Sequence, residues 1–577
     1  MEYKTKDLEL KRHLVDLTPF LVILFGYIGF IFIRYWMFPV SSDGLAFCYV
    51  SAFPEKAFSV FTRFFNLYLT KMIVFPFDNL LRGYALASLL YHVGTIIFAY
   101  LIAKRLAGKV QGLLAAIFTA LCPFFFAFAT EYFSDAPCLF FGLGALYFSI
   151  IGNSHSKNYL KYFFSGFLLA ASLFSKPFGI VFIIPVMINL LSSRLWKKMI
   201  YFLMGILGVM LFIALNDYIW LGDFIFHLNP RNYFLYKNIV SVDLAGLNNM
   251  SSGRPLDITD GWLIAYLIFF MAYLYQGMNS LKNRGNFNWK NRGSFSLALA
   301  GFSLIILFAR TSFLHPGWWV QSHYSYCLIV PWIVAFCSFI RFIEEPESKK
   351  GKPSKSDFMS GLLSILFVIT LFTTKNSHIY SLSRLSFGRF FYLFSLWILI
   401  FAITLILITG NYLHRNGYRK TAAFFFLIGC IGIMWHNANW AAKFSSEAFN
   451  KKEYIQTNAF LEKYRDLLKK APVIPIHCNV SRSFELFASL RLAKLIDEKN
   501  IKSFIEKRNL QSVIRANSAP FYVLTKKDDA DSLAQEANAQ SRRVISVQNG
   551  SFFDCSFYLI SHLDQVDKEI LFKSHKE

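Results

Sequence analysis

Apolar residues gather along this chain in long runs, without the strict alternation of a strand. A bilayer core is about 30 Å thick, so a helix that crosses it needs about 20 mostly apolar residues. Lipid offers no hydrogen-bond partner to the backbone, and runs without alternation favour helices over a closed barrel. The pattern predicts about 13 spanning helices. They are expected at residues 18–38, 83–103, 110–128, 136–152, 161–175, 178–193, 199–216, 261–280, 294–310, 324–341, 358–374, 389–409 and 421–438.

The stretch 161–193 is ambiguous because Lys176-Pro177 either interrupts one long helix or separates two. Lys and Arg residues precede the first run and then recur in every second loop, as between residues 104 and 109. Basic loops stay in the cytoplasm, which places the N-terminus there. Two spans in 161–193 keep this alternation intact, and the odd count then puts the C-terminus on the outer side. The first run is too long for a removable signal peptide and reads as a retained anchor.

Composition excludes several classes of protein. Hydrophobic residues make up 55% of the chain and charged residues 16%, whereas soluble domains have about 45–50% and about 25%. A soluble enzyme, a disordered chain and a fibrous repeat are therefore ruled out. The net charge of +24 suits cytoplasmic loops held against anionic lipid. The basic residues are scattered between apolar runs, so no nucleic-acid-binding face is expected.

The composition changes after about residue 440. Apolar runs shorten to strand length, and amphipathic stretches at helical spacing lie between them. The short runs are Val473–Ile476, Phe521–Leu524, Val544–Val547 and Phe557–Ile560, and the amphipathic stretches are Ser483–Glu498, Ile501–Asn509 and Asp529–Ala539. We therefore expect a polytopic α-helical membrane domain over residues 1–440 and a soluble, extracytoplasmic α/β domain over residues 441–577.

Common cofactor motifs are missing from the sequence. It contains no CxxC pair, Walker loop, GxSxG, HExxH or dinucleotide fingerprint, so zinc, redox chemistry and ATP-driven transport have no support. Cys478 and Cys555 each lie beside a predicted strand, and either a disulfide between them or two free thiols fits an oxidising compartment.

Acidic residues cluster where predicted spans meet the outer face, which has loops at 39–82, 129–135, 217–260, 311–323 and 375–388. Asp43 follows the first span in an aromatic context, where partial desolvation suits a carboxylate to proton transfer. Glu131 and Asp135 lie before the fourth span. For Asp43 alone, a helix cap or a solvated loop acid is the preferred interpretation, and for Asp135 alone it is capping of the fourth helix. Residues 54–75 read as a pair of amphipathic helices in the membrane interface.

An ordered set of motifs accompanies these acids. It comprises Asp43 after the first span, Arg82-Gly83-Tyr84-Ala85-Leu86-Ala87-Ser88 opening the second, Gly112-Leu113-Leu114-Ala115-Ala116 through Pro123 in the third, Ser134-Asp135 before the fourth, and Ser175-Lys176-Pro177 before the sixth. In this order the chain resembles the GT-C superfamily of polyprenyl-phosphate-sugar-dependent glycosyltransferases. Within it, the chain is most similar to the family 39-like branch of protein O-mannosyltransferases and lipid A aminoarabinose transferases.

The resemblance implies roles for individual residues. Asp43 matches the acid of the first outer loop, which acts on the acceptor, and Asp135 matches the second acid. Family members often have another acid directly after the first, where this chain has Gly44, so Glu55 could substitute. An Arg-Tyr pair is common before the tenth span, and the nearest match here is His323-Tyr324.

An anionic leaving group also requires cations at the membrane edge. The candidates are Arg63, Lys71, Arg82, Lys176, Arg231, Arg254, Arg310 and His323. Arg82, Lys176 and His323 adjoin span ends and are favoured as donor-phosphate ligands, although each alone could be a snorkelling interface residue.

Other polar and aromatic residues complete the expected site. Glu131 and Glu55 are candidate substrate ligands. Trp318 and Tyr324 could stack on a sugar ring, and an interfacial aromatic belt gives the same pattern. His227 and Asp223 offer a ligand pair for a divalent cation, but an ordinary loop hydrogen bond is the preferred interpretation, so no cofactor is assigned.

The expected function is transfer of a sugar from a polyprenyl-phosphate donor to an acceptor hydroxyl on a lipid, glycan or protein, at the outer face of a bacterial inner membrane. Membrane lipids and the lipid-linked donor are the expected partners. The alternatives are a transporter or flippase for lipid-linked glycans and an oligosaccharide ligase. Transporters place ionisable residues near the bilayer midplane and show paired repeats, whereas here the acids cluster at one edge.

Overall fold

The computed structural model describes 14 segments of the chain, and all structural statements below concern them. They are residues 17–32, 42–53, 63–121, 125, 128–152, 159–191, 196–229, 231–232, 330, 473–475, 521–526, 530–539, 542–552 and 555–562.

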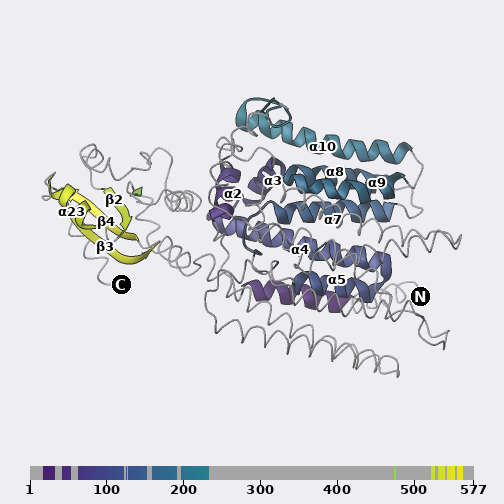
Figure 1. Cartoon of the computed structure of the whole chain (residues 1–577), viewed down its shortest axis with the longest axis horizontal. Helices are drawn as coiled ribbons and strands as arrows, with labels where there is room; N and C mark the ends of the chain where they lie inside the picture. Colours follow the sequence, from purple (N-terminus) through teal and green to yellow (C-terminus); the bar gives the residue numbers. More distant parts are fainter. Residues whose placement is uncertain are drawn as a thin grey trace, which may run out of the picture.

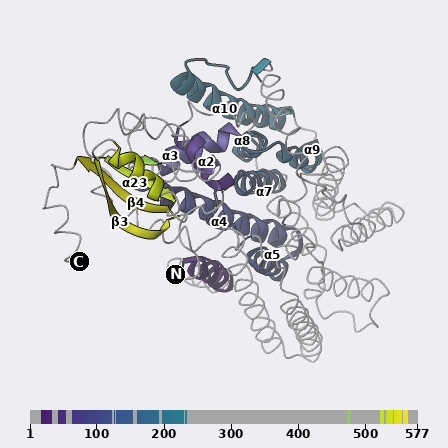
Figure 2. The ribbon, with the colours of Figure 1, turned by 60° about the vertical axis from the view of Figure 1, so that its left-hand side comes forward.

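The first half of the chain forms a bundle of roughly parallel and antiparallel helices (Figure 1). Its long members are a helix at Leu17–Phe32, α4 (Leu80–Ala107), α5 (Lys109–Leu121), α7 (Asp135–Gly152), α8 (Leu160–Ser175), α9 (Ile183–Leu191) and α10 (Trp196–Leu221). Helix α10 packs on α8, α8 on α7, α7 on α4 and α4 on α5, so neighbours in space follow this order (Figure 2).

The helices lie where the apolar runs predicted spans. Two of the described helices, Leu80–Leu106 and Trp196–Leu221, are long and apolar enough to cross a membrane by length and composition. The others are shorter apolar helices over their described lengths. The predicted spans from 261 onward lie outside the described residues, so the total of about 13 stays a prediction.

The ambiguous stretch 161–193 forms two helical segments. Helix α8 ends at Ser175, Lys176 is extended (φ −161°, ψ 136°), and the 3₁₀ helix η2 occupies Pro177–Phe182 before α9. The chain turns back here, since a Cβ on Gly179 would lie 2.7 Å from the Leu173 nitrogen of α8. Proline supplies no amide hydrogen to continue α8, so the turn at Lys176-Pro177 follows from the sequence.

Two predictions about the outer segments need correction. Residues 42–52, expected in a loop, form helix α2 (Ser42–Ala52). The second interfacial helix is present as α3 (Phe64–Val74), but most of it is buried, including Asn66 and Thr70. Its polar side chains find hydrogen-bond partners within the bundle, so α3 enters the bundle and only its last turn exposes Met72 and Ile73.

The end of α10 also differs from expectation. Residues 217–221 were assigned to an outer loop but belong to this helix, so Asp217, Tyr218 and Trp220 are helical. The predicted span stopped at residue 216 because Asn216-Asp217 ends the apolar run. Both side chains are satisfied inside the protein, which allows the helix to continue past them.

The C-terminal region contains a four-stranded sheet in the order β1-β2-β4-β3. The strands are β1 (Val473–Pro475), β2 (Phe521–Lys526), β3 (Arg542–Phe552) and β4 (Cys555–His562), and helix α23 (Ala530–Asn538) packs on β3. Strand β1 is parallel to β2, and the other pairs are antiparallel, with Tyr522 opposite Leu559. The strands coincide with the predicted short apolar runs. Most of residues 441–577 lies outside the described residues, so the whole domain and the Cys478–Cys555 disulfide stay predictions.

Two glycines allow α8 and α10 to approach closely. A Cβ on Gly166 would lie 1.9 Å from the Phe202 carbonyl oxygen, and one on Gly205 would lie 2.1 Å from the Phe163 carbonyl oxygen. Small residues at such crossings let membrane helices pack backbone to backbone. Both glycines are therefore needed for the close approach of α8 and α10.

We predict that Gly205→Ala lowers the stability of the bundle by about 1–3 kcal/mol, because the added methyl group forces α8 and α10 apart. The midpoint of thermal unfolding in detergent measures this effect. Gly208→Ala is the matched control, since the nearest atom to its Cβ would be 3.6 Å away. Equal midpoints for the two variants would show that the close crossing is not maintained in solution.

Candidate active site

A buried ion pair joins the start of α7 to the end of α8. The Lys176 Nζ donates a hydrogen bond to Asp135 Oδ1, and the two side chains are 3% and 1% exposed. Asp135 is the first residue of α7, where an acid is also favoured by the helix dipole. Lys176 lies between α8 and η2. The sequence assigned these residues to separate roles, and the structure brings them into direct contact.

Hydrogen bonds from neighbouring residues hold this pair in place. The Lys176 amide donates to the Ser172 carbonyl (3.0 Å), and the Ser172 hydroxyl donates to the Cys138 carbonyl (2.8 Å). The Lys176 carbonyl in turn accepts from the Gly179 amide (2.9 Å). Because Cys138 lies on α7 and Ser172 on α8, these bonds fix the two helices at the height of the ion pair.

Arg63 brings a third charge to the same place. It immediately precedes α3, and its guanidinium lies 4.8 Å from the centre of the Phe47 ring of α2. The charges of Asp135, Lys176 and Arg63 all act on the Cys138 thiol, which puts Arg63 in the electrostatic neighbourhood of the ion pair. Arg63 was only one of eight candidate cations in the sequence. Its position depends on how α3 packs, which no local pattern reveals.

Glu131 connects the loop before α7 to α4 and α2. It is 1% exposed, and its carbonyl accepts a hydrogen bond from the Ser88 hydroxyl of α4 (2.5 Å). Burial, and then the Glu131 charge, raises the pKa of the Cys48 thiol well above its ordinary value. Cys48 is on α2, so the Glu131 carboxylate lies close to the helix that begins next to Asp43.

The backbone of Asp43 lies in the first turn of α2, not in a loop. The direction of its side chain lies outside what the structure describes. The α2 helix is held by the Ser51 hydroxyl, which donates to the Leu67 carbonyl of α3 (2.7 Å). Asp43 therefore lies in the first turn of a helix that contacts both α3 and α4. Arg63 precedes α3, and Glu131 is joined to α4 through Ser88.

Of the remaining predicted site residues, only Arg82 lies in the described part of the chain. Arg82 is exposed in the first turn of α4, where its amide donates to the capping side chain of Asn79 (3.4 Å). The residues Glu55, Trp318, His323 and Tyr324 lie outside the described residues, so their roles stay predictions.

Buried polar side chains join α3 to the loop before α7 and to α4. The Asn66 amide donates to the Tyr132 hydroxyl (3.2 Å), which donates to the Asn66 carbonyl (3.0 Å). The Thr70 and Tyr91 hydroxyls share a hydrogen bond of 3.0 Å. Burial raises the pKa of Tyr132 well above its ordinary value, so this hydroxyl remains neutral and donates.

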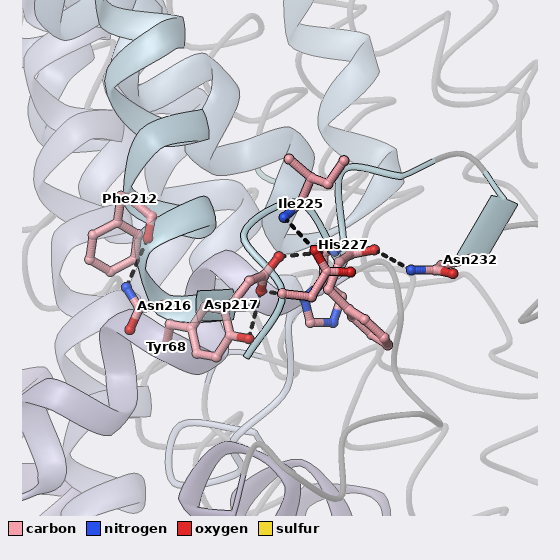
Figure 3. A network of polar contacts seen from close by, with 9 residues as sticks. Tyr68, Phe212, Asn216, Asp217, Ile225, His227 and Asn232 are labelled. Atoms are coloured by element: carbon pink, nitrogen blue, oxygen red, sulfur yellow. Dashed lines mark hydrogen bonds and ion pairs between the residues drawn. The ribbon is translucent and has the colours of Figure 1, made fainter. Parts of the chain in front are cut away.

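A second buried network lies at the end of α10 (Figure 3). The Tyr68 hydroxyl of α3 donates to Asp217 Oδ1 (2.8 Å), which is also 2.6 Å from His227 Nδ1. The His227 amide donates to Asp217 Oδ2 (2.9 Å). Asp223, the other member of the ligand pair considered for a divalent cation, accepts a hydrogen bond from the Ile225 amide (3.1 Å). The preferred interpretation of His227, a hydrogen bond, holds with a different partner.

Metal binding finds no support in the described part of the chain. No group of three or more His, Cys, Asp or Glu side chains there could hold a metal ion.

Asp217 was missed as a partner of His227 because it was assigned to a loop, whereas the helix brings its carboxylate back over the following turn.

We predict that Lys176→Met lowers stability by about 3–5 kcal/mol, because it leaves the Asp135 carboxylate buried and unpaired. The double variant Lys176→Met with Asp135→Leu should recover most of this loss, since both charges are then gone. Thermal unfolding in detergent measures both effects. Arg82→Gln, at an exposed position, serves as the control and should change stability by less than about 0.5 kcal/mol. A wild-type midpoint for Lys176→Met would refute the buried pair.

The comparisons with known proteins agree with this fold. Residues 64–220 match the family described as dolichyl-phosphate-mannose-protein mannosyltransferase. The matched segment includes α3, Glu131, Asp135 and Lys176, and it begins directly after Arg63. No curated protein sequence matches the chain.

Two solved structures have the same overall fold. ArnT from Cupriavidus metallidurans in the apo state superposes with a TM-score of 0.55 and 11% identity, over 96% of this chain and 98% of that one. ArnT from the same organism bound to undecaprenyl phosphate gives a TM-score of 0.53 and 11% identity, over 94% and 98%. The family match over residues 64–220 and the ArnT fold thus confirm that this chain resembles the GT-C superfamily of membrane glycosyltransferases.

Proposed function

We propose that this protein transfers a sugar from a polyprenyl-phosphate donor to an acceptor hydroxyl. The observation that carries the proposal is the cluster of buried charges around the Asp135–Lys176 pair, inside the segment that matches the mannosyltransferase family. A similar fold binds undecaprenyl phosphate in ArnT, which supports a lipid-linked donor for this chain as well.

The chemistry requires a base and an anion site. The acceptor oxygen attacks the anomeric carbon, its proton passes to a carboxylate, and the bond between that carbon and the phosphate oxygen breaks. A positioned general base accelerates such a step by about 10²–10⁴. We assign this role to Asp43, since it begins α2 beside the helices that carry Arg63 and Glu131. The lipid phosphate leaves as an anion and takes no proton from the protein.

The leaving phosphate needs a cation that is not already neutralised. Asp135 compensates the charge of Lys176, so Lys176 acts first as the partner that keeps Asp135 ionised. Arg63 stacks on Phe47 and is partly exposed, so it is better placed to meet an incoming phosphate. A guanidinium can also bind phosphate through two parallel hydrogen bonds. We therefore assign binding of the donor phosphate to Arg63. The Lys176–Asp135 pair supports the site without binding the phosphate directly.

The wider architecture is part of the same proposal. It has about 13 spanning helices over residues 1–440, a cytoplasmic N-terminus and an outer α/β domain over residues 441–577. The reaction then takes place at the outer face of a bacterial inner membrane, where α2, α3 and the starts of α4 and α7 lie. The acceptor could belong to a lipid, a glycan or a protein, and the sugar is any that a polyprenyl phosphate carries.

We predict that Asp43→Asn lowers the rate of sugar transfer by about 10²–10⁴, because the amide cannot accept the acceptor proton. The measurement is transfer of radiolabelled sugar from a synthetic polyprenyl-phosphate sugar by purified protein, with lipid and glycan acceptors supplied in parallel. Asp78→Asn, an exposed acid that precedes α4, is the matched control and should keep wild-type activity. Wild-type transfer by Asp43→Asn would remove Asp43 from the mechanism.

A further inference from the structure

The Tyr68–Asp217–His227 network joins α3 to the end of α10 and to the segment that follows it. Tyr68 comes from α3, Asp217 from the last turns of α10, and His227 from the segment that follows α10. Asp217 has no exposed surface and receives hydrogen bonds on both carboxylate oxygens. Burial and the Asp217 charge raise the pKa of Tyr68, so its hydroxyl stays protonated and keeps donating. The network therefore holds α3 against α10.

Aromatic contacts extend this connection towards the candidate site. The Phe64 ring of α3 stacks on the His227 ring, with centroids 4.1 Å apart and planes at 27°. The same Phe64 ring packs 5.8 Å from Phe174, which lies two residues before Lys176. Arg63 directly precedes Phe64 and caps α3. Any shift of α3 against His227 thus moves Arg63 relative to the Asp135–Lys176 pair.

The network itself is separate from the reacting groups. The hydrogen bonds described above join Tyr68, Asp217 and His227 to one another, and Tyr68 connects them to α3. Its influence on the site must therefore pass through the placement of α3. This distinguishes a positioning role from a catalytic one.

We propose that Tyr68, Asp217 and His227 are positioning residues that fix α3 so that Arg63 faces the phosphate of the lipid-linked donor. This inference rests on the proposed function and adds to it residues outside the family's motif set. A donor bound by a displaced Arg63 loses affinity before it loses reactivity. The network therefore controls the donor KM, and kcat is governed by Asp43.

The test is a double-mutant cycle between Tyr68→Phe and Arg63→Gln. Tyr68→Phe keeps the ring and removes only the hydroxyl that bonds to Asp217. The readout is binding of undecaprenyl phosphate to the purified full chain in detergent, followed by donor KM and kcat. We expect Tyr68→Phe to weaken binding about tenfold and to raise KM with kcat unchanged. In the Arg63→Gln background, Tyr68→Phe should weaken binding by less than about twofold, because residues that act through one another are not additive.

The matched control is Asn216→Ala. Asn216 is the neighbour of Asp217 and is also buried, but its side chain donates to the Phe212 carbonyl within α10 (2.8 Å) and does not connect to α3. We expect wild-type binding from this variant. His227→Gln provides a second perturbation of the network, with the same expected dependence on Arg63.

The outcomes separate the two proposals. Wild-type binding by Tyr68→Phe, or an equal loss in both Arg63 backgrounds, overturns the positioning role and leaves the proposed function intact. A wild-type protein that does not bind undecaprenyl phosphate overturns the proposed function and this inference with it. A fall in kcat without a change in KM would mean that the network acts on the reaction step and not on the donor.

Discussion

The structure depends on the requirement that charge inside an apolar bundle be paired. Asp135 and Lys176 are both almost completely buried, and neither could remain ionised there alone. Their pairing fixes where α7 begins and where α8 ends, and it sets the position at which the chain reverses into η2. Glu131 is buried in the loop before α7, and the Arg63 charge acts on the Cys138 thiol of α7, so the start of this helix concentrates charge.

Polar groups are distributed unevenly along the bundle. The end that contains α2 and α3 has buried hydroxyls, amides and acids, among them Ser51, Asn66, Thr70 and Glu131. Buried polar side chains such as Gln111 and Asn189 also occur elsewhere, but much of the remaining bundle packs through apolar groups, as where Tyr100 stacks on Phe20 with centroids 4.2 Å apart, and through the glycines between α8 and α10. Under the proposed function, apolar packing supplies a rigid support and the polar end holds the anionic lipid head group against fixed donors.

The helices of the bundle were predictable because burial in lipid or protein demands long apolar runs, and α7 and α8 follow those runs closely, whereas α10 continues past the end of its run. The break at Lys176-Pro177 was predictable because proline ends a helix. Helices α2 and α3 were harder to predict from the sequence. The sequence placed α2 in a loop and α3 in the membrane interface, and only partners such as Tyr132 and Leu67 show that both helices are buried. Asp43, Glu131 and Asp135 were identified from sequence as acids near one rim, but their individual partners were not.

The sequence by itself determined the class of the protein, the helical segments of its first half, the strands at its end and the group of acids from which the site is built. These features depend on local composition and on spacing along the chain. Tertiary structure alone decided that Asp135 pairs with Lys176, that His227 pairs with Asp217, and that Arg63 lies against Phe47 of α2 whereas Arg82 is exposed at the start of α4. The partners of a buried charge lie far away in sequence, 41 residues for Lys176 and Asp135, so the packing of helices selects them.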